Sequence, residues 1–161
     1  MLKKVILMVV LMSLEGFSQN PVSDIILSKA VFEEKIEWVN PGRPIRKMVS
    51  ARGKKVKKGT TLVYVNQIFN NSSVTKKEIV VDNPIPTGTA YIRGTSNCEG
   101  VCSMLYSIDG GKTFKDSSQL YVIYGATKRL AKGSEYTHIK FIFPEVLPYS
   151  KIRMAFKAKI K

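Results

Sequence analysis

Histidine and cysteine are scarce in this sequence of 161 residues, which contains one histidine and two cysteines. These are too few soft ligands for an ordinary zinc site built from cysteine and histidine. A Ser/His/Asp or Cys/His catalytic centre is also excluded unless His138, the single histidine, is its base. The sequence therefore predicts no metal site, no cofactor, no catalytic residues and a protein that is not an enzyme.

Acidic residues are also in short supply, since 12 Asp and Glu face 26 Lys and Arg, for a net charge of +14 at pH 7. Apolar residues make up 44% and charged residues 24%, and this globular composition excludes wholesale disorder. At this length a single domain is expected. The positive charge favours an anionic envelope polymer, such as lipopolysaccharide or an acidic glycan, as a partner, while a merely well-solvated surface is the plainer interpretation.

Apolar runs of membrane-spanning length are missing, because the run over residues 5–14 falls short of the roughly 20 residues required. Two lysines precede it, and the small residues Gly16 and Ser18 follow it, as in a secretory signal. We predict a signal peptide over residues 1–18 and one β-sandwich domain over residues 19–161. The predicted product is exported to the periplasm or the cell surface and has no membrane span after processing.

Helical periodicity is missing too, since no window shows a convincing apolar helical stripe with caps. Short runs of apolar, β-branched and aromatic residues alternate instead with turn residues. These runs predict strands over residues 60–69, 78–82, 89–95, 103–108, 119–124, 136–143 and 151–160. Strands at this spacing without intervening helices favour an all-β fold of antiparallel sheets packed as a sandwich, with a closed barrel as the alternative.

The segment over residues 25–39 is ambiguous. Its content of Glu and Lys would suit an amphipathic helix, but the Asn-Pro-Gly sequence over residues 40–42 ends it in the manner of a hairpin or loop. We interpret it as an opening strand, and the helix remains the alternative.

The last predicted strand alternates cleanly between apolar and basic residues, so that one face enters the core and the other faces water. The basic face carries Lys151, Arg153, Lys157 and Lys159. If this strand is an edge, it could pair with a second copy or with an envelope protein by strand addition. Lysines on an edge are also a means of preventing such pairing.

A dense basic segment lies between the first two predicted strands. Its cations are Arg46, Lys47, Arg52, Lys54, Lys55, Lys57 and Lys58. So many like charges predict a solvated loop or edge hairpin, which is a candidate polyanion-binding surface. Nucleic acid is not an expected ligand, because no aromatic residues are interleaved with the cations.

Cys98 and Cys102 form a closely spaced pair, which in an exported protein predicts a disulfide. The bridge would close a small ring and hold the tip of a loop. A CxxC redox motif is excluded, because three residues separate the cysteines.

Asp109, Gly110 and Gly111 lie between two apolar runs and predict a hairpin turn, because glycine adopts the required positive φ at little cost. Together with Ser107 and Thr113, this turn fits the Asp-box pattern of sialidase-type propellers. A propeller needs several copies and this chain has one, so a glycan-processing enzyme is only a remote alternative.

Residues 56–71, 80–89, 106–114 and 136–140 together resemble, in that order, the bacterial "conserved repeat domain" family, also called domain of unknown function eleven. The resemblance covers roughly residues 24–161. It implies an immunoglobulin-like antiparallel sandwich of about seven to nine strands, used in exported proteins as a surface or stalk module. Lys58 replaces the family's usual proline, and the module occurs once, so a stalk role does not carry over directly. The function predicted is binding or assembly at the cell envelope.

Overall fold

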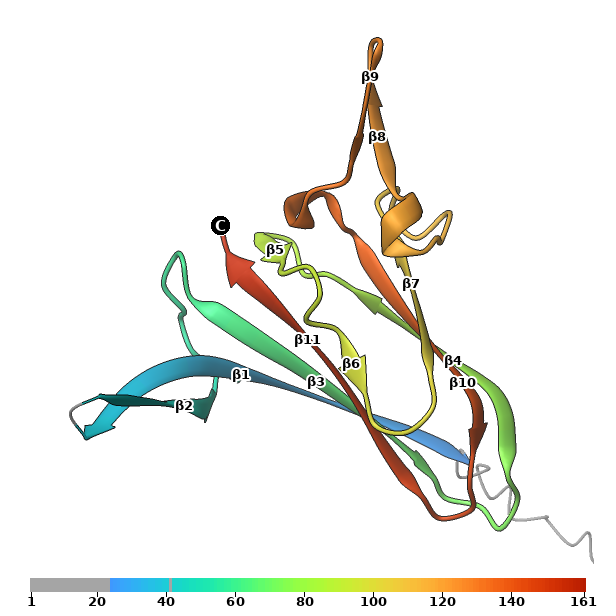
Figure 1. The fold of residues 1–161 in the computed structure, drawn as a ribbon. Coiled ribbons are helices and arrows are strands. Elements are labelled where there is room, and N and C mark those ends of the chain that lie inside the picture. Colours follow the sequence, from blue (N-terminus) through green and yellow to red (C-terminus); the bar gives the residue numbers. More distant parts are fainter. Residues whose placement is uncertain (1–23, 41) are drawn as a thin grey trace, which may run out of the picture.

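The computed structural model describes residues 24–40 and 42–161, and the predicted signal peptide lies outside these residues. The described chain consists of strands with two short 3-10 helices (Figure 1). The strands are β1 (Ile25–Asn40), β2 (Arg43–Ser50), β3 (Thr61–Asn70), β4 (Lys76–Pro84), β5 (Thr89–Tyr91), β6 (Asn97–Cys98), β7 (Ser103–Ser107), β8 (Tyr121–Tyr124), β9 (Thr127–Leu130), β10 (His138–Val146) and β11 (Lys151–Ile160). The helices are η1 (Ser117–Gln119) and η2 (Gly133–Glu135).

Two antiparallel sheets form the body of the molecule. The first sheet has the order β2-β1-β3-β11-β5, with β6 also paired to β11, and the second has the order β4-β10-β7. Strands β8 and β9 pair with each other as a separate ribbon. The predicted all-β sandwich is confirmed, and the described strands outnumber the expected seven to nine because several are only two to four residues long.

The core lies between the two sheets and is built by strand alternation. In β10, Ile139, Phe141 and Phe143 are completely buried, and Ile68 of β3 and Met154 of β11 pack against them. The residues between them along each strand face outward. The alternation predicted for residues 151–160 is therefore confirmed.

The ambiguous segment over residues 25–39 is a strand, as interpreted. Its first half, from Ile25 to Glu33, pairs with β3, and its second half, from Phe32 to Asn40, pairs with β2. Part of the predicted basic loop thus belongs to β2, which is an edge strand. Its cations are tolerated there because β1 places Glu34 and Glu37 within reach of them.

The two sheets differ in width. A side-chain hydrogen bond from Asn66 of β3 to Asn83 places β4 above β3. At the opposite side, the hydroxyls of Ser96 and Tyr106 lie 2.5 Å apart and hold β7 beside the segment that leads into β6. Within the described chain, β1 and β2 therefore extend past the edge of β4 with no strand of the second sheet above them.

The sheets are held together at one end and separate toward the other (Figure 1). At the closed end, the buried side-chain amide of Asn70 donates to the carbonyl oxygens of Val146 and Leu147, at 3.0 and 3.1 Å. The side chain of Lys76, at the start of β4, pairs with Asp24, which precedes β1. The open end lies toward Pro84, the last residue of β4.

None of the helices in the described part of the chain has the length and apolar character required to cross a membrane.

Candidate binding groove beside strand β4

A groove of about 650 Å³ opens where β1 extends past β4. Its walls include Lys29 and Val31 of β1, Arg52 of the connection from β2 to β3, and Pro84 and Pro86 at the end of β4. Val31 pairs with Tyr64 in the β1–β3 ladder, so their side chains share the inner face of the sheet. The groove is therefore the uncovered part of the sandwich interior.

The floor of the groove is aromatic. The rings of Tyr64 and Phe156 stack with centroids 5.0 Å apart and planes inclined by 16°. Burial raises the pKa of Tyr64, so its phenol stays neutral at physiological pH. The hydrogen-bonded amides of Asn66 and Asn83 close the floor toward the core. The site thus offers a flat apolar surface with a few fixed polar groups.

Strand β4 borders the groove with an unpaired edge. It pairs with β10 on one side only. The backbone N–H of Ile85 donates to the carbonyl oxygen of Thr137, in the direction of β10. Because the backbone groups of successive residues point alternately to the two sides of a strand, those of Asn83 and Val81 also bond to β10. The intervening Pro84, Asp82 and Val80 direct their backbone groups outward, which suits Pro84 because proline has no N–H to donate.

The charge on the groove wall is positive. Lys29 and Arg52 line it, and neither forms an ion pair with any acidic side chain in residues 24–40 and 42–161. A ligand that brings carboxylates to this wall would balance the two charges.

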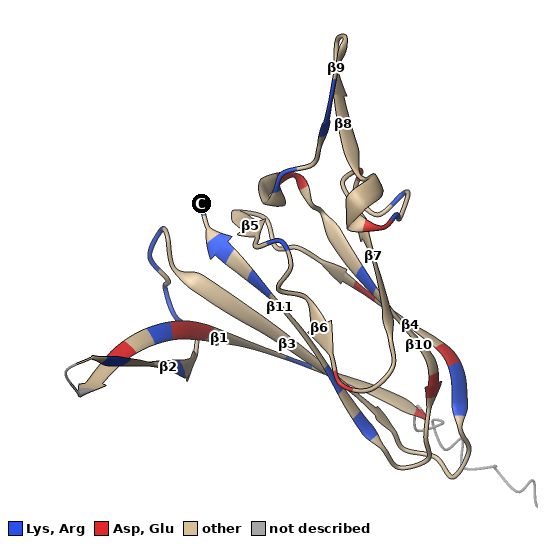
Figure 2. Ribbon diagram, viewed as in Figure 1, with Lys and Arg blue, Asp and Glu red and all other residues tan. Residues whose placement is uncertain are grey.

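The predicted polyanion-binding set is divided by the structure. Arg46 and Lys47 lie on opposite faces of β2 and pair with Glu34 at 3.6 Å and Glu37 at 3.4 Å. The remaining cations lie in the connection from β2 to β3, are exposed, and have no acidic partner among the described residues; they are Arg52, Lys54, Lys55, Lys57 and Lys58 (Figure 2). Their loop ends beside β11, where the N–H of Gly59 donates to the carbonyl of Ile160.

The predicted outer face of β11 is present, but the suggestion that β11 is an edge is wrong. Lys151, Arg153, Lys157 and Lys159 alternate with buried residues as expected. However, β11 pairs with β3 along one side and with β5 and β6 along the other. The local pattern cannot reveal this, because alternation gives the faces of a strand and not its neighbours.

Two of those β11 cations are engaged in ion pairs. The ammonium of Lys157 lies 2.6 Å from a carboxylate oxygen of Glu34, across the outer face of the sheet. The guanidinium of Arg153 lies 3.8 Å from Glu99, and both side chains are exposed. The outer face of β11 is therefore less positive than its sequence implies.

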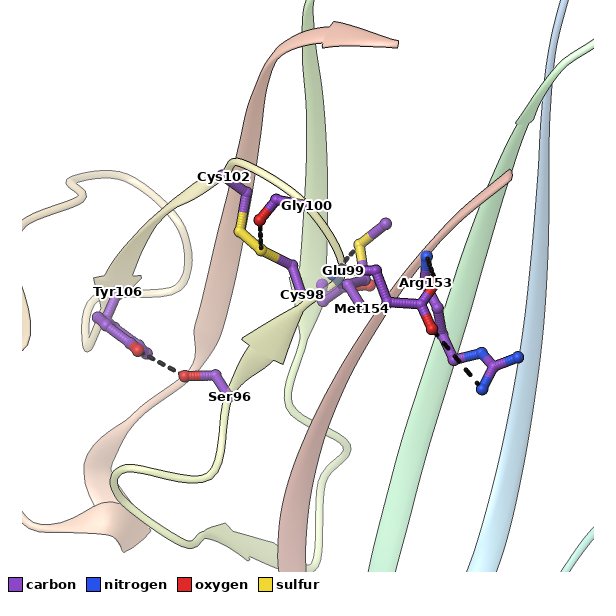
Figure 3. Close-up of a disulfide and its surroundings, with 9 residues drawn as sticks. Ser96, Cys98, Glu99, Gly100, Cys102, Tyr106, Arg153 and Met154 are labelled. Carbon is purple, nitrogen blue, oxygen red and sulfur yellow. Dashed lines mark hydrogen bonds and ion pairs between the residues drawn. A yellow bond between two sulfur atoms is a disulfide. The ribbon is translucent and has the colours of Figure 1, made fainter. Parts of the chain in front are cut away.

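The disulfide between Cys98 and Cys102 is confirmed, with Cα atoms 6.6 Å apart (Figure 3). Its position differs from the expected loop tip, because Cys98 ends β6 in the first sheet and Cys102 directly precedes β7 in the second. The bridge thus fixes the place where the chain passes between the sheets, and both cysteines pack against the core. Such a bond indicates an oxidising compartment.

Asp109 organises the predicted turn. Its Oδ1 accepts hydrogen bonds from the Ser107 hydroxyl at 2.6 Å and from the backbone N–H of Thr113 at 3.0 Å, and its Oδ2 accepts from the Thr113 hydroxyl. These bonds hold the pKa of Asp109 well below its usual range. The turn closes with a bridge between Tyr106 and Lys115. The carboxylate is thus fully used in shaping this segment.

His138 packs beneath the same turn. Its ring lies edge-on to Phe114, with centroids 6.4 Å apart, and its nearest atoms would lie 3.3 Å from a Cβ on Gly111. Its Nδ1 has no hydrogen-bond partner among the described residues. The geometry gives this histidine a packing role.

The groove is not among the features predicted from the sequence. Signals for it were present in Asn83 and Pro84, since an amide in an apolar run and a proline within a strand are both unusual in a central strand. The contribution of β1 could not be anticipated, because it depends on the unequal widths of the two sheets.

In comparisons with known proteins, no family model, curated protein or solved structure matches this chain. The resemblance to the conserved repeat domain family therefore stays a prediction.

Proposed function

We propose that the protein is an exported, non-enzymatic module that binds or assembles with other proteins of the cell envelope through the groove beside β4. The observation that carries the proposal is the unpaired edge of β4 next to the uncovered inner face of β1. Export is supported by the disulfide and by the signal-like residues 1–18.

An extended segment of a partner fits this geometry. Lying alongside β4, it would add a fourth strand to the second sheet, and its backbone would bond to the outward groups of Val80 and Asp82. Its inward side chains would contact Leu27, Val31 and Tyr64, which are apolar or aromatic residues on the inner face of the first sheet. Alternating apolar residues are therefore the expected pattern of the partner segment.

The charge of the groove favours an acidic partner segment. Carboxylates would meet Lys29 and Arg52 on the groove wall. A second copy of this chain is a less suitable partner, because its net charge of +14 opposes close association with itself.

A photo-reactive residue at Val31 tests the proposal in cells that export the protein. We expect it to cross-link to an envelope protein, and Asp82→Pro to abolish the adduct by removing the outward N–H that a partner carbonyl would use. Asp82→Ala is the matched control and should retain the adduct. No adduct, or an adduct unaffected by Asp82→Pro, would contradict the proposal.

The charge contribution has its own test. Lys29→Glu in the groove should weaken the cross-link, whereas Lys57→Glu in the loop makes the same change in net charge and should not. Equal loss in the two variants would mean that overall charge, and not the groove, governs binding.

Export is tested by the N-terminus of the protein recovered from cell fractions. We expect a chain that begins at Gln19 in the periplasmic or extracellular fraction. An uncleaved chain in the cytoplasm would contradict export.

Polyanion binding is a second candidate function, favoured by the unpaired lysines of the β2–β3 connection. Binding to purified lipopolysaccharide should weaken as salt increases. Replacing Lys54, Lys55, Lys57 and Lys58 by Gln should reduce affinity about tenfold or more if the loop is the contact. Changing Lys77 and Lys151 to Gln is the control, and equal affinity of wild type and the fourfold variant would rule this candidate out.

A further inference from the structure

The ribbon formed by β8 and β9 stands away from both large sheets (Figure 1). The two strands pair only with each other among the described strands, from Tyr121 opposite Leu130 to Tyr124 opposite Thr127. The turn between them starts at Gly125, whose φ of 58° is one that glycine adopts readily. The result is a narrow projection that ends in a tight turn.

The tip of this ribbon exposes a large apolar or aromatic side chain on each of its faces. Ile123 and Tyr124 are neighbours in β8 and therefore point to opposite faces, and their exposed fractions are 72% and 87%. The nearest charged residue is Lys128, which lies opposite Ile123 in the ladder. A ribbon that packs on a protein surface needs only one apolar face, so a tip with two is suited to surroundings that contact it from all sides.

The base of the ribbon is positively charged. The side chain of Lys128 extends from its position opposite Ile123 toward the base, where its ammonium lies 4.3 Å from the centre of the Tyr121 ring. Lys112, Lys115 and Lys132 are exposed in the adjoining segments (Figure 2). The carboxylates of Asp116 and Glu135 nearby already accept hydrogen bonds from neighbouring residues. Asp116 accepts hydrogen bonds from the N–H and hydroxyl of Ser118, and Glu135 accepts two from the guanidinium of Arg129.

We propose that the β8–β9 ribbon is a membrane-contacting element whose tip enters the headgroup region of an anionic lipid surface. Ile123 would lie against the acyl boundary and Tyr124 at the headgroup level, where aromatic side chains with a polar group are favoured. The lysines at the base would contact anionic headgroups. Only the tip enters, because the unpaired backbone edges of a two-stranded ribbon remain in water. This goes beyond the proposed function and uses a different part of the molecule.

Sedimentation with lipid vesicles tests this inference on the full processed chain. Wild type should bind vesicles containing phosphatidylglycerol and should bind vesicles of phosphatidylcholine alone much less. The double variant Ile123→Ser/Tyr124→Ser should bind the anionic vesicles at least about tenfold more weakly. Val101→Ser/Tyr149→Ser is the matched control, because it removes one aliphatic and one aromatic side chain that are 78% and 64% exposed elsewhere on the surface.

Fluorescence provides a readout that does not depend on affinity. In a Trp38→Phe background, a tryptophan introduced by Tyr124→Trp should shift its emission to the blue on adding anionic vesicles. Equal binding of the double variant and its control, an unshifted emission, or equal binding to neutral vesicles would each overturn the inference. A cross-link from position 124 to a protein, without vesicle binding, would assign the ribbon to a protein partner instead.

Discussion

The centre and the margin of the first sheet use the same alternating pattern with opposite results. At its centre, β11 buries Met154, Phe156 and Ala158 beneath the second sheet. At its margin, the inner-face residues Leu27 of β1 and Ile45 of β2 remain 43% and 45% exposed, because no described strand of the second sheet lies over them. Burial is thus decided by what covers a strand. Stability is concentrated in the covered part, and the uncovered part is available for contacts.

The largest expected effect is in the covered part. Phe141 is completely buried, so Phe141→Ala should lower the free energy of unfolding by about 3–5 kcal/mol. Ile45→Ala, on the inner face of the margin, should lower it by about 1 kcal/mol or less, because this side chain is half exposed. Urea denaturation followed by circular dichroism gives both values. Similar losses for the two variants would remove the distinction between the two parts, and Phe141→Leu provides a milder core variant if the alanine variant does not fold.

The disulfide should contribute the next largest effect. A five-residue ring restricts the unfolded chain by about 2 kcal/mol in the chain-entropy model, so Cys98→Ala/Cys102→Ala should lose about that amount. The same assay measures it. Reducing agent should destabilise wild type by a similar amount and leave the double variant unchanged. A loss near zero would show that the crossing between the sheets is held without the bridge.

Alanine substitutions at the neighbouring Gly110 and Gly111 distinguish the stability cost of backbone strain from the cost of a tight side-chain contact. Both have positive φ, so Gly110→Ala should cost about 1 kcal/mol from strain alone. Gly111→Ala should cost more, because the new Cβ would lie 3.3 Å from atoms of the His138 ring, whereas nothing lies within 4 Å at Gly110. Equal losses from the two substitutions would mean that the histidine ring moves aside freely.

The smallest expected effect is a pH-dependent change in stability that involves Glu135, near the base of the β8–β9 ribbon. Hydrogen bonds from Arg129 and from the N–H of Lys132 lower the pKa of Glu135 from 4.5 to about 2. Because the folded pKa is the lower one, this contribution is complete above pH 4.5 and is lost as the pH falls toward 2. The difference in melting temperature between wild type and Glu135→Gln should therefore shrink over that interval. A constant difference would contradict the assigned hydrogen bonds.

Local features of this fold were predictable from the sequence. The faces of β11, the Cys98–Cys102 bridge and the Asp109 turn each depend on residues within a few positions of one another. The strand over residues 25–39 was also interpreted correctly, because its ending resembled a hairpin.

Long-range features were not predictable. The central position of β11 and the groove beside β4 depend on which distant strands become neighbours, and alternation carries no such information. The strand character of β2 was hidden by its cations, whose repulsion is relieved by Glu34 and Glu37 on another strand. The seven cations predicted as one surface therefore lie partly in the β1–β2 strand pair and partly in the connection from β2 to β3.

The pairing of β11 with β3 also affects how the chain reaches its native state. Lys159 pairs with Thr61, and Lys151 with Phe69, so the middle of the sheet joins segments that are far apart along the chain. Contacts of this kind form slowly, because a long loop must close before any of them is gained. During synthesis, one side of β3 stays unpaired until β11 emerges from the ribosome. Such a delay is compatible with the export proposed above, in which the chain would cross the membrane before it folds.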